Sequence, residues 1–124
     1  MTYDPRNHQL FISDEQGKTE TVVDTRTDRR VATIAMGGKV GNSQYDPVSD
    51  TVFADVQTRD DIVAIDPETH RINRRYKLPP TCRHDHGLLL DPASHLGFVA
   101  CDGNARLLVL SMPSMQTLSI HRTG

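Results

Sequence analysis

Apolar residues along the chain fall into short runs separated by polar turns, and the same order of runs occurs three times. YDPRNHQLFIS at residue 3 is followed by YDPVSDTVFAD at residue 45 and by LDPASHLGFVA at residue 90, at offsets of 42 and 45 residues. Self-similarity at a fixed period of about 20 to 50 residues is typical of repeat architectures. We therefore interpret the chain as three copies of one unit.

Each unit predicts four short β-strands in up-and-down order. The first strand ends at an Asp-Pro step, where proline fixes φ for a tight turn, and the second strand follows as LFIS, VFAD or GFVA. Runs rich in branched apolar residues, TVVD, IVAI and LLVL, predict the third strand. VATIA, NRRYKL and TLSIH predict the fourth. A four-stranded antiparallel unit of about 40 to 45 residues has the size of one β-propeller blade.

The expected fold is therefore all-β, a single partial β-propeller spanning residues 1–124. We place blade 1 at about 1–41, blade 2 at about 42–85 and blade 3 at about 86–124, with the first strand of each blade at the central channel and the last strand outside. Apolar residues make up 36% of the 124 residues and tryptophan is absent, which leaves a thin core. Because propellers usually have about four to eight blades, we expect either further blades in a longer parent chain or a homo-oligomer that completes the ring.

The repeat also resembles a known family. LFISDEQGKTETVVDTRTDRRVATIAMGG and VFADVQTRDDIVAIDPETH are similar to the YVTN-type β-propeller repeat of YncE-like proteins, and the resemblance covers essentially the whole chain. It implies a typically seven-bladed propeller, commonly exported to the periplasm and related in fold to the haem-binding propeller of some nitrite reductases. It implies little about activity, because one fold hosts many functions. No apolar run has the length of a membrane span, and MTYDPRNHQ is not an export leader.

Polar side chains are expected to gather at one end of the propeller. The links between blades and the loops between second and third strands lie on the same face of a propeller, around the channel mouth. A small polar or anionic ligand would suit the mixed cationic, imidazole and amide groups there. The candidate ligand-binding residues are Asn42, Arg59, His84, His86, Asp102 and Asn104, with Arg83 beside them. Each of them also fits an ordinary turn or a solvated loop, and His86 fits equally a residue that caps the inner strand by hydrogen bonding.

The two cysteines allow three arrangements. Cys82 begins the link that feeds blade 3 and Cys101 ends the second strand of that blade, so they could reach the Cα separation of about 5.5 Å that a disulfide needs. They could instead pack as two buried thiols. A zinc site could form from Cys82, His84 and His86, which share one side of an extended backbone, with Asp102 as the nearest fourth ligand. The disulfide and the zinc site exclude each other because both use Cys82.

The functional hypotheses follow from these groups. No nucleophile, base and orienting residue form a set, so we assign no catalytic residue, and the leading hypothesis is a non-enzymatic ligand-binding or interaction scaffold. The sequence leaves the cofactor unknown. One alternative is a metal-dependent hydrolase similar to lactonase propellers, which draw carboxylate and amide ligands from several blades. Another is binding of single-stranded nucleic acid through Arg71, Arg74 and Arg75 around Tyr76. A net charge of −2 makes nucleic acid an unfavoured partner, and a solvated outer strand explains the same arginines.

Overall fold

The computed structural model describes all of residues 1–124 as twelve β-strands and one short 3-10 helix. The strands form three separate four-stranded sheets, which confirms the predicted set of partial-propeller blades. No helix has the length and apolar character needed to cross a bilayer. The elements are β1 (Thr2–Asp4), β2 (Gln9–Asp14), β3 (Thr19–Asp24) and β4 (Arg29–Ala35) in blade 1; β5 (Val40–Asp46), β6 (Thr51–Val56), β7 (Asp61–Asp66) and β8 (Arg71–Lys77) in blade 2; and β9 (Asp85–Asp91), β10 (Leu96–Cys101), η1 (Asp102–Asn104), β11 (Arg106–Ser111) and β12 (Gln116–Arg122) in blade 3.

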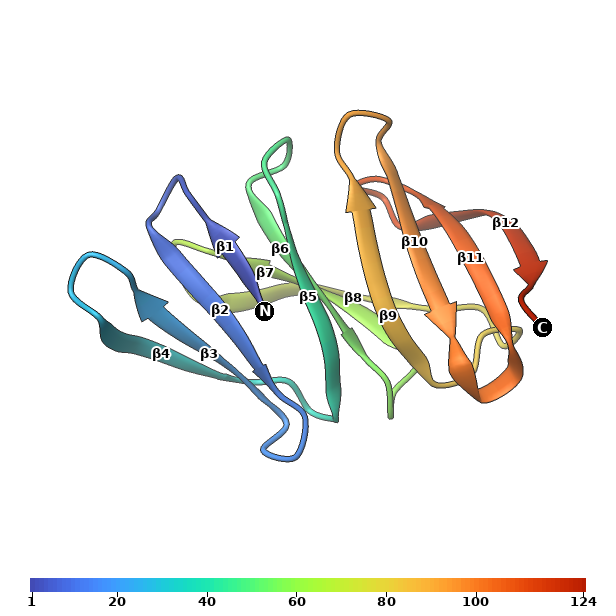
Figure 1. Ribbon diagram of the computed structural model, residues 1–124, viewed down its shortest axis with the longest axis horizontal. Helices are drawn as coiled ribbons and strands as arrows, with labels where there is room; N and C mark the ends of the chain where they lie inside the picture. The colour runs from blue at the N-terminus through green and yellow to red at the C-terminus, as the bar shows by residue number, and fades with distance from the viewer.

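Strand order within each sheet follows chain order, and every neighbouring pair is antiparallel. Figure 1 shows the three sheets side by side, with blade 2 between the other two and β1, β5 and β9 toward the viewer. Strand β5 starts at Val40 and β9 at Asp85. Both strands therefore begin one or two residues before the blade boundaries expected at residues 42 and 86.

The Asp-Pro steps end the first strands for a local reason. The carboxylate of Asp4 accepts a hydrogen bond from the backbone N–H of Arg6 at 2.9 Å, and that of Asp46 accepts one from Val48 at 3.1 Å. An aspartate that satisfies its own turn in this way competes with continuation of the strand. Each turn then closes on a residue with positive φ: His8 (55°), Asp50 (49°) and His95 (57°).

The core of the molecule lies between the blades. We call the side of a blade that turns toward the next blade its leading face, and the opposite side its trailing face. Ten buried apolar residues join blades 1 and 2, and thirteen join blades 2 and 3. Phe11 and Phe53 occupy the same repeat position on the leading faces of blades 1 and 2, and they are 0% and 1% exposed. Each blade therefore depends on its neighbour for burial, as expected for a repeat whose units cannot bury their apolar faces alone.

Candidate functional site

The link into blade 3 and the loop after β10 are bound to each other along their backbones. Cys82 and Cys101 are joined by a disulfide with a Cα–Cα distance of 5.3 Å. The N–H of Asp102 donates to the carbonyl oxygen of His84, and that of Gly103 donates to the carbonyl oxygen of Arg83, both at 3.1 Å. These contacts bring together, at one end of the joint between blades 2 and 3, several of the residues that the sequence placed at the channel mouth.

Asn104 uses both ends of its side chain on this link. Its Oδ1 accepts from the backbone N–H of Arg83 at 3.2 Å, and its Nδ2 donates to the carbonyl oxygen of Thr81 at 2.8 Å. An amide whose donor and acceptor both bind backbone groups has little capacity left for a ligand. Asn104 therefore acts as a brace between the loop and the link.

Replacing this brace should measurably weaken the fold. We expect Asn104→Ala to lower the free energy of unfolding by about 1 to 2 kcal/mol, because two side-chain hydrogen bonds are lost. Chemical denaturation of the two proteins at one pH measures the difference. Asn42→Ala, at an exposed amide whose side chain makes no hydrogen bond, is the matched control and should change the value by less than about 0.5 kcal/mol. Equal losses in both variants would mean that Asn104 does not brace the link.

Three further predicted ligand-binding residues are engaged in pairs at the surface. His84 Nδ1 lies 2.6 Å from Asp102 Oδ1, and the backbone N–H of His84 donates to Asp60 Oδ1 at 2.7 Å. Arg59 Nε donates to Asp61 Oδ2 at 3.1 Å. The side chains of His84, Asp102 and Arg59 are each about half exposed, so these pairs shape the loops more than they stabilise them.

The local backbone does not have the geometry that the zinc alternative requires. His84 has a φ of 56°, in the left-handed region, so Cys82, His84 and His86 do not alternate along one extended strand. The sulfur of Cys82 is bonded to Cys101. A thiolate ligand at this position would require the disulfide to be reduced first.

Asn42 and His86 are exposed and lie beside a buried carboxyl group that the sequence analysis missed. Asp55, which is 0% exposed, accepts hydrogen bonds from the backbone N–H groups of Asn42 and Gly87, the latter at 2.8 Å. One carboxyl group therefore ties β5 to β9, the inner strands of blades 2 and 3. Gly87 has a φ of 141°, which other residues rarely adopt. Burial raises the pKa of Asp55.

Two more carboxyl groups are buried at the joints. Asp85 is 0% exposed and neither of its carboxyl oxygens has a hydrogen-bond partner. Burial, followed by the negative charge of Asp55, raises its pKa to about 8. In the joint between blades 1 and 2, Glu20 is equally buried and accepts from Ser43 Oγ at 2.7 Å, and burial raises its pKa.

A sequence signal for these groups exists in the repeat. Asp85 occupies the repeat position of the buried Val40, and Glu20 occupies that of the buried Ile62. A carboxyl group at a repeat position that is apolar in another copy is a candidate buried charge. Such a group is costly to ionise away from water.

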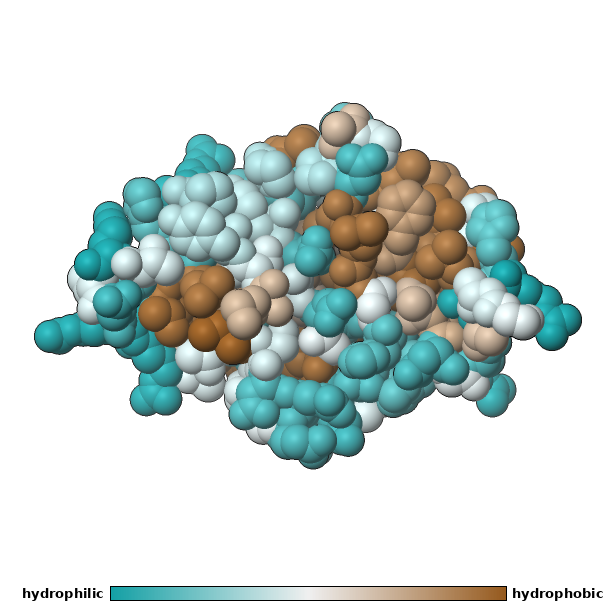
Figure 2. Space-filling view, viewed as in Figure 1, coloured by the Kyte–Doolittle hydropathy of each residue, from teal (hydrophilic) through white to brown (hydrophobic).

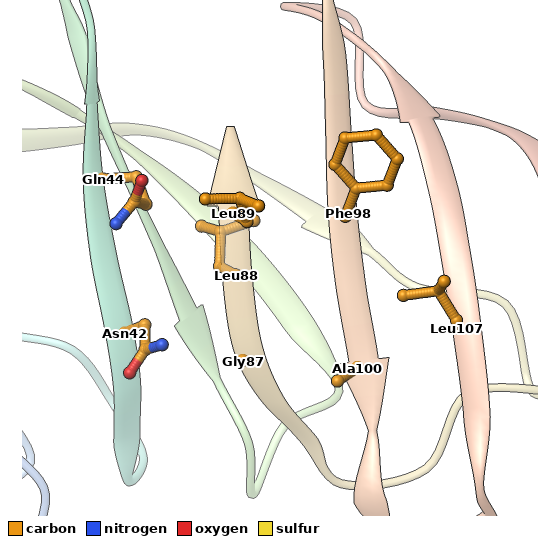
Figure 3. A pocket seen from close by; sticks show the side chains of 8 residues that line it. All are labelled: Asn42, Gln44, Gly87, Leu88, Leu89, Phe98, Ala100 and Leu107. Carbon is orange, nitrogen blue, oxygen red and sulfur yellow. The ribbon is translucent and has the colours of Figure 1, made fainter. Parts of the chain in front are cut away.

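An open hollow of roughly 470 Å³ lies across β5, β9, β10 and β11. Figure 3 shows the amides of Asn42 and Gln44 on one side of it and apolar side chains on the other. The apolar side consists of Leu88, Leu89, Phe98, Ala100 and Leu107, with Gly87 between the two sides. A second hollow, of roughly 350 Å³, adjoins the disulfide and is lined by Asp60, Lys77, Leu78, Pro79, Pro80, Cys82 and Arg83. Of the six predicted ligand-binding residues, Asn42 alone lines a hollow.

Comparison with known proteins supports the fold. No protein-family model and no curated protein sequence matches the chain. Among solved structures, hydrazine synthase from Kuenenia stuttgartiensis, a β-propeller-containing protein, superimposes on 99% of the chain with a TM-score of 0.85 and 22% sequence identity. The chain spans 35% of the length of that neighbour. At this identity the likeness concerns architecture only, and with the three four-stranded sheets it shows a partial set of β-propeller blades.

Proposed function

We propose that the chain is part of a non-enzymatic β-propeller scaffold that holds a small polar or anionic ligand beside the inner strands of blades 2 and 3. The observation that carries this proposal is the Asp55 carboxyl group, which binds the backbone of both strands. It holds the backbone at Asn42 and at Gly87, the residue that follows His86, so the exposed amide of Asn42 and the exposed imidazole of His86 come from neighbouring strands that the same carboxyl group joins. Gln44, at the edge of the adjoining hollow, supplies a second amide.

The other candidate residues contribute to this site indirectly. Asn104 braces the link into blade 3, and His84, Asp102 and Arg59 are paired with neighbouring groups. Their contacts hold the link that leads into β9, and rigid support of this kind keeps a binding side chain in place. The ligand would thus contact Asn42 and His86 directly, and the link into blade 3 and the loop after β10 would hold these two residues in place.

The proposed location of the scaffold is an oxidising compartment. The disulfide between Cys82 and Cys101 is of the kind that persists in exported proteins and is rare in the reducing cytosol. The resemblance to YncE-like proteins implies the same compartment. Fractionation of the producing cell would place the native protein, and a reduced cytosolic pool would contradict this location.

The ligand proposal is tested by titration with two probes, inorganic phosphate for the anionic class and glucose for the neutral polar class. We expect the backbone amide resonances of Asn42 and His86 to shift with one of them, because both residues lie at the proposed contact. His86→Ala should weaken that binding about tenfold, the equivalent of about 1.4 kcal/mol. His121→Ala, which removes an exposed imidazole from the outer strand β12, should leave it unchanged.

Two outcomes would overturn the proposal. Shifts confined to other parts of the chain, or equal weakening by both histidine variants, would remove the site. Turnover of lactones or esters that disappears in His86→Ala would show an enzyme instead of a binding scaffold.

A further inference from the structure

Large apolar side chains are exposed mainly on the two end blades. Blade 2, which has a neighbour on each side, exposes one of them, Val48, in a turn. On the inner strands of the end blades, Tyr3 is 47% exposed and Leu89 is 60% exposed. Figure 2 shows a broad hydrophobic area over β9, β10 and β11 of blade 3. A contiguous apolar area on a protein surface is a candidate site of interaction.

The register of blade 3 identifies this area as a leading face. Leu89 pairs with Phe98, and Phe98 pairs with Val109, so the three side chains lie on one side of the sheet. Phe98 occupies the repeat position of Phe11 and Phe53, each of which the following blade buries almost completely. In blade 3 the same aromatic position borders the open hollow. The face is therefore built to receive the trailing face of another blade.

Blade 1 carries a matching trailing face. Leu10 and Val23 pair across β2 and β3, as do Ile12 and Thr21. All four are partly exposed. The residues at the same repeat positions of blade 2 are 0% exposed because they pack on blade 1: Val52, Ala54, Val63 and Ile65. Blade 1 thus exposes a trailing face, and blade 3 exposes a leading face with no trailing face packed against it.

The existing joints also indicate which residues would meet. In the joint between blades 1 and 2, the backbone N–H of Tyr45 donates to Thr2 Oγ1 at 2.9 Å, so these inner-strand positions are in contact. Leu89 in blade 3 occupies the same repeat position as Thr2 in blade 1. Tyr3 in blade 1 occupies the same repeat position as Tyr45 in blade 2. The corresponding pair in a new joint is Leu89 of one chain with Tyr3 of another.

We propose that the leading face of blade 3 receives the trailing face of blade 1 from a second copy of this chain, so that copies join head to tail with Leu89 beside Tyr3. The second copy is the occupant because one chain carries both halves of the joint. The contact is heterologous, and such contacts form either closed rings or open series. Two copies hold six blades, within the usual range of about four to eight for a closed propeller.

Complementation between two variants tests the proposal. Leu89→Asp damages the leading face and leaves the trailing face, whereas Tyr3→Asp does the reverse. We expect the unmodified protein to sediment as two or more chains, each variant alone as a single chain, and an equal mixture of the two as a complex of two chains. Val48→Asp, at the exposed apolar residue of blade 2, is the matched control and should associate like the unmodified protein. Circular dichroism of each variant establishes that it is folded.

Cysteine cross-linking adds a second measurement. A Tyr3→Cys chain mixed with a Leu89→Cys chain should form a mixed disulfide dimer at least tenfold faster than either variant forms a dimer with itself. Three outcomes would overturn the proposal: a single chain at every concentration up to about the millimolar range, no complex in the variant mixture, or preferential linking of Leu89→Cys to itself. The last result would indicate a symmetric contact of two leading faces, and the first would indicate that further blades of a longer parent chain cover these faces.

Discussion

The unmodified protein should lose more stability between pH 5.5 and pH 8 than the Asp85→Asn variant, by about 3 kcal/mol. This value follows from a side chain whose pKa is about 8 in the folded protein, against an ordinary 3.8, since one pKa unit corresponds to about 1.4 kcal/mol. Denaturant titrations of both proteins at the two pH values measure the difference. The amide is nearly the same size as the carboxyl group, so the variant tests charge and leaves the packing in place.

The direction of the effect comes from which state holds the proton. Burial and the charge of Asp55 raise the pKa of folded Asp85, and Asp60 and Asp61 act in the same direction. Between the ordinary value and about 8, the folded chain keeps a proton that the unfolded chain has released. Stability therefore falls as the pH rises through this window, and the contribution of Asp85 is most favourable below it.

Asp28→Asn is the matched control for this prediction. Asp28 is an exposed turn residue with a φ of 55°, a conformation that asparagine also tolerates. The control should reproduce the pH dependence of the unmodified protein. If Asp85→Asn followed the same curve, Asp85 would be ionised in the folded protein at pH 8 at no cost, and the joint between blades 2 and 3 would contain a partner for its charge.

The fold could be predicted because its signals are local and recur. The Asp-Pro steps end the first strands through their own side chains, as Asp4 and Asp46 show, and the branched apolar runs predict the third strands. Three copies of the same order then indicate one blade each. The repeat also places Cys82 in the link into blade 3 and Cys101 at the end of the second strand of that blade. Both positions lie at the same end of the blade, so a disulfide between them could be considered from the sequence.

The site was harder to predict because it depends on contacts between distant segments. Asn104 belongs to an ordinary turn in the sequence, but its amide binds backbone groups more than twenty residues away. Asp55 and Asp85 sit near strand ends, where an aspartate taken by itself predicts a solvated residue, and only the comparison of repeat positions sets Asp85 against the buried Val40. Only the packing of blade 3 against blade 2 removes both carboxyl groups from water.

Removal of the disulfide should lower the free energy of unfolding by about 3 kcal/mol. The bond between Cys82 and Cys101 closes a loop with a sequence separation of 19 residues, and the chain-entropy relation gives this magnitude for a loop of that length. Denaturant titration with and without reductant measures the loss. The Cys82→Ala, Cys101→Ala double variant should be equally destabilised and should not respond to reductant.

The loss should also have a local signature. In the folded protein, Asp102 and Gly103 donate their backbone hydrogen bonds to His84 and Arg83 across the segment that the disulfide closes. Reduction removes the covalent bond next to these two hydrogen bonds. The amide hydrogens of Asp102 and Gly103 should therefore exchange with solvent at least tenfold faster through local opening. The exchange rate of the Phe53 amide in the core should change only with the global free energy of unfolding. Faster exchange at Phe53 with no change at Asp102 and Gly103 would mean that the disulfide acts on the unfolded chain alone, and that the hydrogen bonds of Asn104 suffice to hold the link.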